Sequence, residues 1–243
     1  MLVRLVAIVI IVVGWTVPSS AQTIPGASPR LEAIVDTFKK QSPAERYKQL
    51  FDALAASAIL TRQLSALADV GDLGGIEIAS SQRPRGMFLA TVEGKKIVFA
   101  ADFMPQLAKK RLHDVAHADD ILPNNLVFVL GTLASRLMHP ISGSPRGLQA
   151  MIQVQMSMQA LAFIDGWNDV VDGATHENGN RPLTPAQGGS LLLNMRYRSV
   201  FIGVKPPAKL DWSLSGKIEP TMNSLQTLGN RIATMNVLDF GIL

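Results

Sequence analysis

Residues 113–117 read His-Asp-Val-Ala-His, which is the most literal metal-binding pattern in the chain. On a helix, side chains four positions apart lie on one face, so His113 and His117 would present two imidazoles to the same ion. Asp114 lies between them, where a carboxylate can act as general base on a metal-bound water. The ligand shell could be completed by one of three further side chains, Asp119, Asp120 or His176. This pattern indicates a metal-dependent hydrolase, and the alternative is a pair of surface histidines in a loop.

A second candidate site lies in residues 124–137, whose sequence is NNLVFVLGTLASRL. Apolar residues recur there at helical spacing, which predicts a helix with one apolar face. That face consists of Val127, Leu130, Leu133 and Leu137. The segment is therefore expected to pack into the core, and its remaining side chains decide whether it also carries chemistry.

The first eight residues of this segment, NNLVFVLG, resemble the lead-in to the active-site helix of zincin-like metallopeptidases of the gluzincin, HExxH type. The resemblance is to proteins associated with bacterial secretion-system toxins. It covers Ile97–Phe201 and includes two later stretches, ALAFIDGWN at 160–168 and LLLNMRYR at 191–198. In this family two histidines four residues apart hold zinc, the glutamate between them polarises the bound water, and a glutamate on a later helix is the third ligand.

The resemblance places other residue types at all four of these positions. If Gly131 aligns with the residue before the first ligand, Thr132 stands at the first histidine position and Leu133 at the glutamate position. Arg136 then stands at the second histidine position, and Gln159 at the position of the third ligand. Threonine is a poor zinc ligand, leucine cannot act as a base, arginine stays protonated, and glutamine lacks the carboxylate charge. The resemblance thus implies a pseudoenzyme that binds no metal or other cofactor at this site.

Two interpretations of these positions remain open. In one, Arg136 fills part of the metal's former place and is hydrogen-bonded to Thr132 and Gln159, so that the three side chains converge. In the other, residues 124–137 form an ordinary core helix that never descended from a metallopeptidase.

The elements that would position these residues predict an α+β fold, mostly helical and zincin-like, with a small antiparallel sheet. Residues 22–71 form a helical layer whose caps are Ser28-Pro29 and the capping box at 42–45, and which stops at Gly71. Residues 74–100 form the sheet, with a hairpin turn at Glu93-Gly94. Residues 123–201 hold the former active-site helices.

The longest of these helices is predicted to start at the cap Ser144-Pro145 and to end near Asp172. Its apolar stripe is expected to be Leu148, Ile152, Met156, Ala160, Phe163 and Trp167. A polar stripe of Asp165, Asn168, Asp169 and Asp172 is interpreted as the solvent-facing side, and the alternative is a cation site. The methionines at 151, 156 and 158 predict core filling, with an adaptable binding surface as the alternative.

Residues 1–21 have the pattern of a secretory signal peptide. Arg4 is followed by an apolar run to Val17 and by small residues up to Ala21, which leaves residues 22–243 as one domain. Cleavage would lower the net charge from +4 to +3, which is too small and too scattered to indicate nucleic-acid binding. The absence of cysteine excludes disulfides and thiol catalysis. We expect a periplasmic protein that does not stay inserted in the membrane.

Taken together, these patterns predict a non-catalytic exported protein that acts by binding another protein. Its most concrete form is a periplasmic immunity protein that neutralises a metallopeptidase toxin, and a toxin-like accessory protein fits the same resemblance. The alternative is a metal-dependent peptidase that uses His113 and His117.

Overall fold

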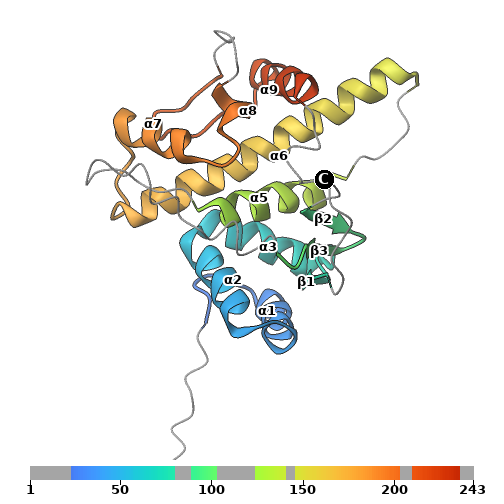
Figure 1. The fold of residues 1–243 in the computed structure, drawn as a ribbon, viewed down its shortest axis with the longest axis vertical. Helices are drawn as coiled ribbons and strands as arrows, with labels where there is room; N and C mark the ends of the chain where they lie inside the picture. The colour runs from blue at the N-terminus through green and yellow to red at the C-terminus, as the bar shows by residue number, and fades with distance from the viewer. Residues whose placement is uncertain (1–22, 80–88, 103–123, 141–145, 203–209, 236–243) are drawn as a thin grey trace, which may run out of the picture.

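The computed structural model describes residues 23–79, 89–102, 124–140, 146–202 and 210–235, and the structural statements below concern these residues (Figure 1). The described part is mostly helical with one three-stranded sheet, which confirms the α+β prediction at that level. The predicted signal peptide at 1–21, the 113–117 motif and the cap at 144–145 lie outside the described residues. None of the described helices is both long enough and apolar enough to span a bilayer.

Three helices form the amino-terminal layer: α1 (Pro29–Gln41), α2 (Ala44–Ala56) and α3 (Ala58–Val70). As predicted, Ser28 caps α1, because its Oγ accepts a hydrogen bond from the backbone N–H of Leu31 at 3.3 Å. The left-handed Gly71, with φ 78°, ends α3 as predicted.

The predicted capping box at residues 42–45 is wrong. The N-cap of α2 is Pro43, and no side chain caps this helix. Only two residues separate α1 from α2, and Ser42 is extended and serves as the C-cap of α1. A residue that precedes proline is driven toward this extended conformation, which makes Ser42 suited to end the first helix.

The sheet contains β1 (Gly75–Ile78), β2 (Ala90–Glu93) and β3 (Lys96–Phe99) in the order β1-β3-β2. The predicted hairpin joins β2 and β3, with φ 61° at Gly94. However, β1 pairs with β3 in parallel, with Ile76 opposite Ile97, so the prediction of an antiparallel sheet is wrong. The turn after α3 brings the chain to the start of β3, where the Gly74 N–H donates to the Lys95 carbonyl, and β1 then runs alongside β3 in the same direction.

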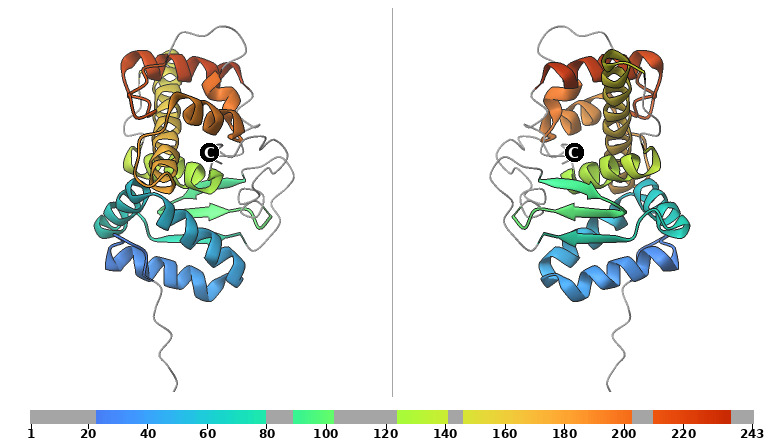
Figure 2. Two further views of the ribbon diagram at one scale, coloured as in Figure 1. Left: turned by 90° about the vertical axis from the view of Figure 1, so that its left-hand side faces the viewer. Right: turned by 90° about the vertical axis from the view of Figure 1, so that its right-hand side faces the viewer.

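Two helices form the centre of the molecule: α5 (Asn125–Met138) and the 30-residue α6 (Leu148–Glu177). Figure 2 shows α5 between the amino-terminal layer with its sheet and the long helix α6. Because it is covered from both sides, α5 is buried at every position from Leu126 to Ser135, and not along one face only, as the sequence predicted. Asn124 caps its first turn by accepting from the N–H groups of Leu126 and Val127.

The carboxyl-terminal elements lie on the side of α6 that is away from the amino-terminal layer (Figure 1). They are α7 (Pro185–Asn194), α8 (Arg198–Ile202) and α9 (Met222–Thr234). Thr184 caps α7 in a complete capping box with Gln187. An aromatic cluster fills the space between α5, α6 and α8, where Phe128 stacks on Tyr197 with 5.3 Å between the ring centroids.

Candidate functional site

The two central helices approach each other through glycine. A Cβ added to Gly131 of α5 would lie 2.1 Å from Oδ2 of Asp169 and 3.0 Å from Cα of Gly166. A Cβ added to Gly166 would lie 2.6 Å from both the Phe128 carbonyl oxygen and Oγ1 of Thr132. We call this contact the α5–α6 seam. Its closeness requires glycine on both helices and fixes which side chains of α5 meet α6.

Two of the four positions singled out by the resemblance lie in the packed interior. Thr132 is fully buried on the α6 side of α5, and its hydroxyl donates to the carbonyl of Phe128 in its own helix at 2.8 Å. Leu133 is also fully buried, as part of the hydrophobic core. Neither position opens onto a space where a substrate and a catalytic group could meet.

The other two positions lie elsewhere. Arg136 lines a cavity formed with α3 and the β2–β3 hairpin, and no residue of α6 belongs to that lining. Gln159 is half-buried on α6. It lies seven residues before Gly166, the residue that faces Thr132, so about 10 Å of helix separates Gln159 from Gly166. Thr132 therefore meets Gly166 and not Gln159, and the structure does not gather Thr132, Arg136 and Gln159 into one cluster.

Three of the polar side chains that α6 presents to its neighbours are carboxylates. Asp165 accepts a hydrogen bond from Oγ of Ser135 on α5 at 2.5 Å. Asp172 accepts from Oγ of Ser57 at 3.0 Å and from the N–H of Ile59 at 3.1 Å. Asp169 lies between these two carboxylates in the sequence, against Gly131. The interpretation of this stripe as the solvent-facing side of the helix is therefore wrong, because its three carboxylates face α5 and the α2–α3 junction and the amide of Asn168 bonds Ile218.

Asp169 is the most unusual of these groups. It is 0% exposed, and within the described part of the chain neither of its carboxylate oxygens has a hydrogen-bond partner. Burial raises its pKa well above the ordinary value, the nearby charges of Asp165 and Asp172 raise it further, and Lys217 opposes them. The pKa of Asp165 is also raised by burial, while Ser135 and His139 lower it.

The sequence contains a signal for this burial in the glycines beside the carboxylates. Gly166 and Gly173 lie on the same side of α6 as the carboxylates, and both approach backbone closely, Gly166 that of α5 and Gly173 that of Ala56. A stripe that alternates glycine with aspartate is typical of a close helix contact rather than of a solvated face. On a solvated face glycine would only lower helix propensity, whereas in a close contact it leaves space for the neighbouring backbone.

No metal site is apparent among the residues that the structure describes. No group of three or more histidine, aspartate or glutamate side chains in those ranges could hold a metal ion. His176, a possible partner for the 113–117 motif, is exposed, and its Nδ1 lies 3.3 Å from Oδ1 of Asn180. His113 and His117 themselves remain a hypothesis from the sequence.

A different surface is formed by the amino-terminal half of α6. The predicted apolar stripe is wrong there: its first positions are not in the core, whereas Ala160, Phe163 and Trp167 are buried as expected. Three apolar side chains that lie on one side of the helix are exposed, and we call them the α6 apolar face: Leu148 (70%), Met151 (48%) and Ile152 (45%). Val154 is also exposed (38%), on another side of the helix. The helix carries no charged residue from Leu148 to Ile164.

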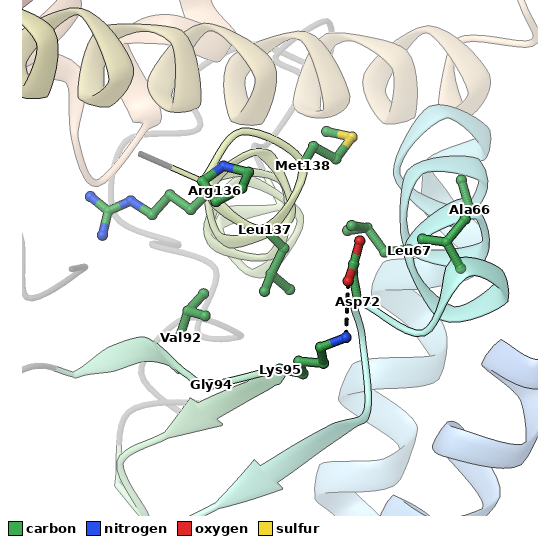
Figure 3. A pocket seen from close by; sticks show the side chains of 11 residues that line it. Ala66, Leu67, Asp72, Val92, Gly94, Lys95, Arg136, Leu137 and Met138 are labelled. Carbon is green, nitrogen blue, oxygen red and sulfur yellow. Dashed lines mark hydrogen bonds and ion pairs between the residues drawn. The ribbon is translucent and has the colours of Figure 1, made fainter. Parts of the chain in front are cut away.

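The cavity beside Arg136 is the second surface feature (Figure 3). Its volume is about 590 Å³, and we call it the Arg136 cavity. Most of its wall is apolar, with Leu67 and Val70 from α3, Val92 from β2, and Leu137 and Met138 from α5. Nζ of Lys95 lies 3.1 Å from Oδ1 of Asp72, and Figure 3 shows the Arg136 guanidinium pointing away from this ion pair. Burial lowers the pKa of Arg136 to about 10, which leaves it charged at neutral pH.

Comparison with known proteins adds no relative. No protein-family model, curated protein or solved structure matches this chain.

Proposed function

We propose that this chain is a non-catalytic protein that acts by binding another protein through the α6 apolar face. The observation that carries the proposal is the exposure of three large apolar side chains on one side of a stretch of helix without charge. Solvated helix surfaces normally carry charged residues, whereas the centres of protein interfaces are poor in charge and rich in methionine and large apolar groups. Single exposed apolar residues are common on any protein, but a continuous group of this kind marks an interaction surface.

The positions at the α5–α6 seam support the non-catalytic part of the proposal. Thr132 and Leu133 are used for packing, and the hydroxyl of Thr132 is bonded to its own helix. A catalytic group needs access to a substrate, and neither side chain has it. The zincin-like ancestry of the scaffold belongs to the same proposal and rests on the sequence resemblance.

The more specific form of the proposal concerns the partner and the compartment. We infer an exported, periplasmic immunity protein whose partner is a metallopeptidase toxin. The support is the signal-peptide pattern of residues 1–21 together with the resemblance to toxin-associated zincin-like proteins. Such a partner would need a charge-poor apolar surface complementary to the α6 apolar face.

Site-specific crosslinking tests this function. A photoreactive residue at Met151 should capture a partner in the periplasm, and the same residue at the exposed Leu193 of α7 is the matched control. The captured protein should show chelator-sensitive proteolysis, which the purified chain inhibits and an Ile152→Lys variant does not. Equal capture from both positions, or a captured protein without such activity, would contradict the immunity function.

The alternative, a metal-dependent hydrolase that uses His113 and His117, predicts a different result. Metal analysis of the purified chain would then show about one equivalent of zinc, which is lost in His113→Ala. Zinc at that level would overturn the non-catalytic proposal.

A further inference from the structure

Residues 211–219 form a short hairpin between α8 and α9, and not all of its apolar side chains are used for packing. Trp212 pairs with Ile218 in an isolated antiparallel bridge, and Ile218 is buried. Leu214, at the tip, is 103% exposed, which is as exposed as a leucine in an unfolded chain, and Trp212 is 42% exposed. The hairpin therefore holds a large apolar side chain in solvent, where it adds nothing to the core.

The turn at the tip does not require a leucine. The N–H of Gly216 donates to the Ser213 carbonyl at 3.0 Å, and the N–H of Ser213 donates to the Lys217 carbonyl at 2.7 Å. Gly216 has φ 80°. This is the pattern of a three-residue hairpin loop, in which a β-turn is followed by a residue in the left-handed conformation. Leu214 follows the first residue of that turn, a position that accepts most residue types. Neither the turn nor the core therefore explains an apolar side chain there.

The hairpin is fastened to α6 by hydrogen bonds and ring packing. Nε1 of Trp167 donates to the Gly216 carbonyl oxygen at 3.0 Å. The side-chain amide of Asn168 bonds both the N–H and the carbonyl of Ile218, at 2.9 and 3.0 Å. Trp212 packs edge-on against Trp167, with 5.6 Å between the ring centroids. A tip that is already fixed in this way loses little conformational freedom when a partner binds it, which favours affinity.

The charges of the hairpin indicate which kind of surface it fits. The N–H of Glu219 donates to the carbonyl of Asp211 at 2.8 Å, and residues opposite each other in an antiparallel pair lie on the same face, so both acids flank the tip together. Lys217 is the one basic residue of the segment, and its Nζ lies 3.9 Å from Oδ1 of Asp172 on α6. The flank is therefore negative. It opposes binding to an anionic lipid surface and complements a protein surface that carries lysine or arginine.

The size of the apolar contact also favours a protein. Burying one leucine shifts a binding constant by about ten- to a hundredfold. Stable anchoring in a bilayer requires much more, since even a single myristoyl chain holds a protein there only marginally. In a protein interface a few side chains in fitted pockets supply most of the affinity, and tryptophan is enriched among them. Leu214, with the half-exposed Trp212 two residues before it, matches that pattern.

We propose that the 211–219 hairpin is a docking site for a second protein, which receives Leu214 in an apolar pocket bordered by basic residues. Leu214 fills the pocket, and Asp211 and Glu219 face the basic border. The hairpin is fastened at Trp167, and about 22 Å of helix separates Trp167 from Ile152 of the α6 apolar face. The docking site is therefore a separate surface and does not depend on the function proposed above.

Crosslinking followed by affinity measurement tests the docking site. A photoreactive residue at Leu214 should capture one protein in intact cells, and the same residue at Val70, which is 71% exposed on α3, is the matched control. In calorimetric titration the purified captured protein should bind Leu214→Ser about ten- to a hundredfold more weakly than the wild type, and should bind Leu214→Met almost as tightly. Because Leu214 is fully exposed, neither variant should change the melting temperature.

A charge variant and a lipid probe complete the test. Glu219→Lys should weaken the same complex about tenfold at low salt and less at high salt, whereas Asp36→Lys, an equal change of charge at an exposed position of α1, should not. No capture from Leu214, equal capture from Val70, or an affinity that Leu214→Ser leaves unchanged would overturn the proposal. Binding to phosphatidylglycerol vesicles that is lost in Leu214→Ser would also overturn it, because the tip would then be a membrane contact.

Discussion

The carboxyl group of Asp169 should make the stability of this protein depend on pH in a direction opposite to that of most aspartates. A salt-bridged aspartate stabilises a protein above its unfolded pKa, because the folded state favours the ionised form. Asp169 has the reverse environment, with full burial, no hydrogen-bond partner within the described residues and two carboxylates nearby. Its folded pKa is therefore raised, and the native state keeps its proton at pH values where the unfolded chain has lost it.

The sign and size of the effect follow from proton linkage. Below the unfolded pKa of aspartate, about 3.9, Asp169 is protonated in both the folded and the unfolded state, so its charge does not change the free energy of unfolding. Above that value the native state binds more protons than the unfolded state, so the free energy of unfolding falls as pH rises. The fall is up to about 1.4 kcal/mol per pH unit and ends where the pH passes the raised folded pKa.

Asp169→Asn removes this proton and keeps the shape of the side chain. We therefore expect the free energy of unfolding of the wild type, minus that of Asp169→Asn, to decline from about pH 4 upward with that slope. Urea unfolding followed by circular dichroism between pH 4 and 8 measures both curves. Asp69→Asn, on the exposed side of α3, is the matched control for the change in net charge.

The reasoning is refuted by one clear outcome. If the difference between the wild type and Asp169→Asn is flat across pH 4 to 8, Asp169 titrates alike in the folded and unfolded chain, and its environment is not the dry interior described above. A difference that rises with pH would show that a cation stabilises the ionised group.

Further predictions concern packing and tethering. Gly166→Ala should lower the free energy of unfolding by about 2–4 kcal/mol, since the added methyl group would meet the backbone of α5. Gly188→Ala in α7 has open space and should raise it by up to about 1 kcal/mol, and thermal unfolding compares the two variants. Asn168→Ala should cost about 2–3 kcal/mol, because its amide bonds both the N–H and the carbonyl of the buried Ile218, at 2.9 and 3.0 Å. Ser57→Ala should cost about 1–2 kcal/mol, since its Oγ caps α3 and donates to Asp172; denaturant unfolding measures both losses.

Features that depend on a few neighbouring residues were predictable from the sequence. The cap at Ser28, the stop at Gly71 and the hairpin at Glu93-Gly94 are all local, because each is a hydrogen bond or a backbone conformation within one turn. The prediction that Ser42 caps the second helix was wrong, because only two residues connect α1 and α2. Ser42 ends the first helix, and the capping-box pattern considers only the helix that follows it.

Features that depend on distant partners were not predictable in this way. The direction of β1 relative to β3 is set by the path of the chain between them, and periodicity does not report it. The carboxylates of α6 have the spacing of a solvated helix face, and their burial depends on the contact with Gly131 of another helix. Likewise, Leu148 and Ile152 share the spacing of the buried Phe163, but α6 extends beyond the elements that cover its second half.

The α5–α6 seam also determines how the two ends of the molecule are mechanically coupled. Among the described elements, α2 and α3 contact both α5 and α6, β2 contacts α5, and α9 packs on α6, but no extensive contact joins α7, α8 or α9 to the amino-terminal layer. Any displacement of one layer therefore reaches the other through the two central helices, which meet at the paired glycines and the aspartates beside them. Because such a rigid glycine contact transmits strain with little compliance, a load on the α6 apolar face should be felt at α5, the helix that supports the Arg136 cavity.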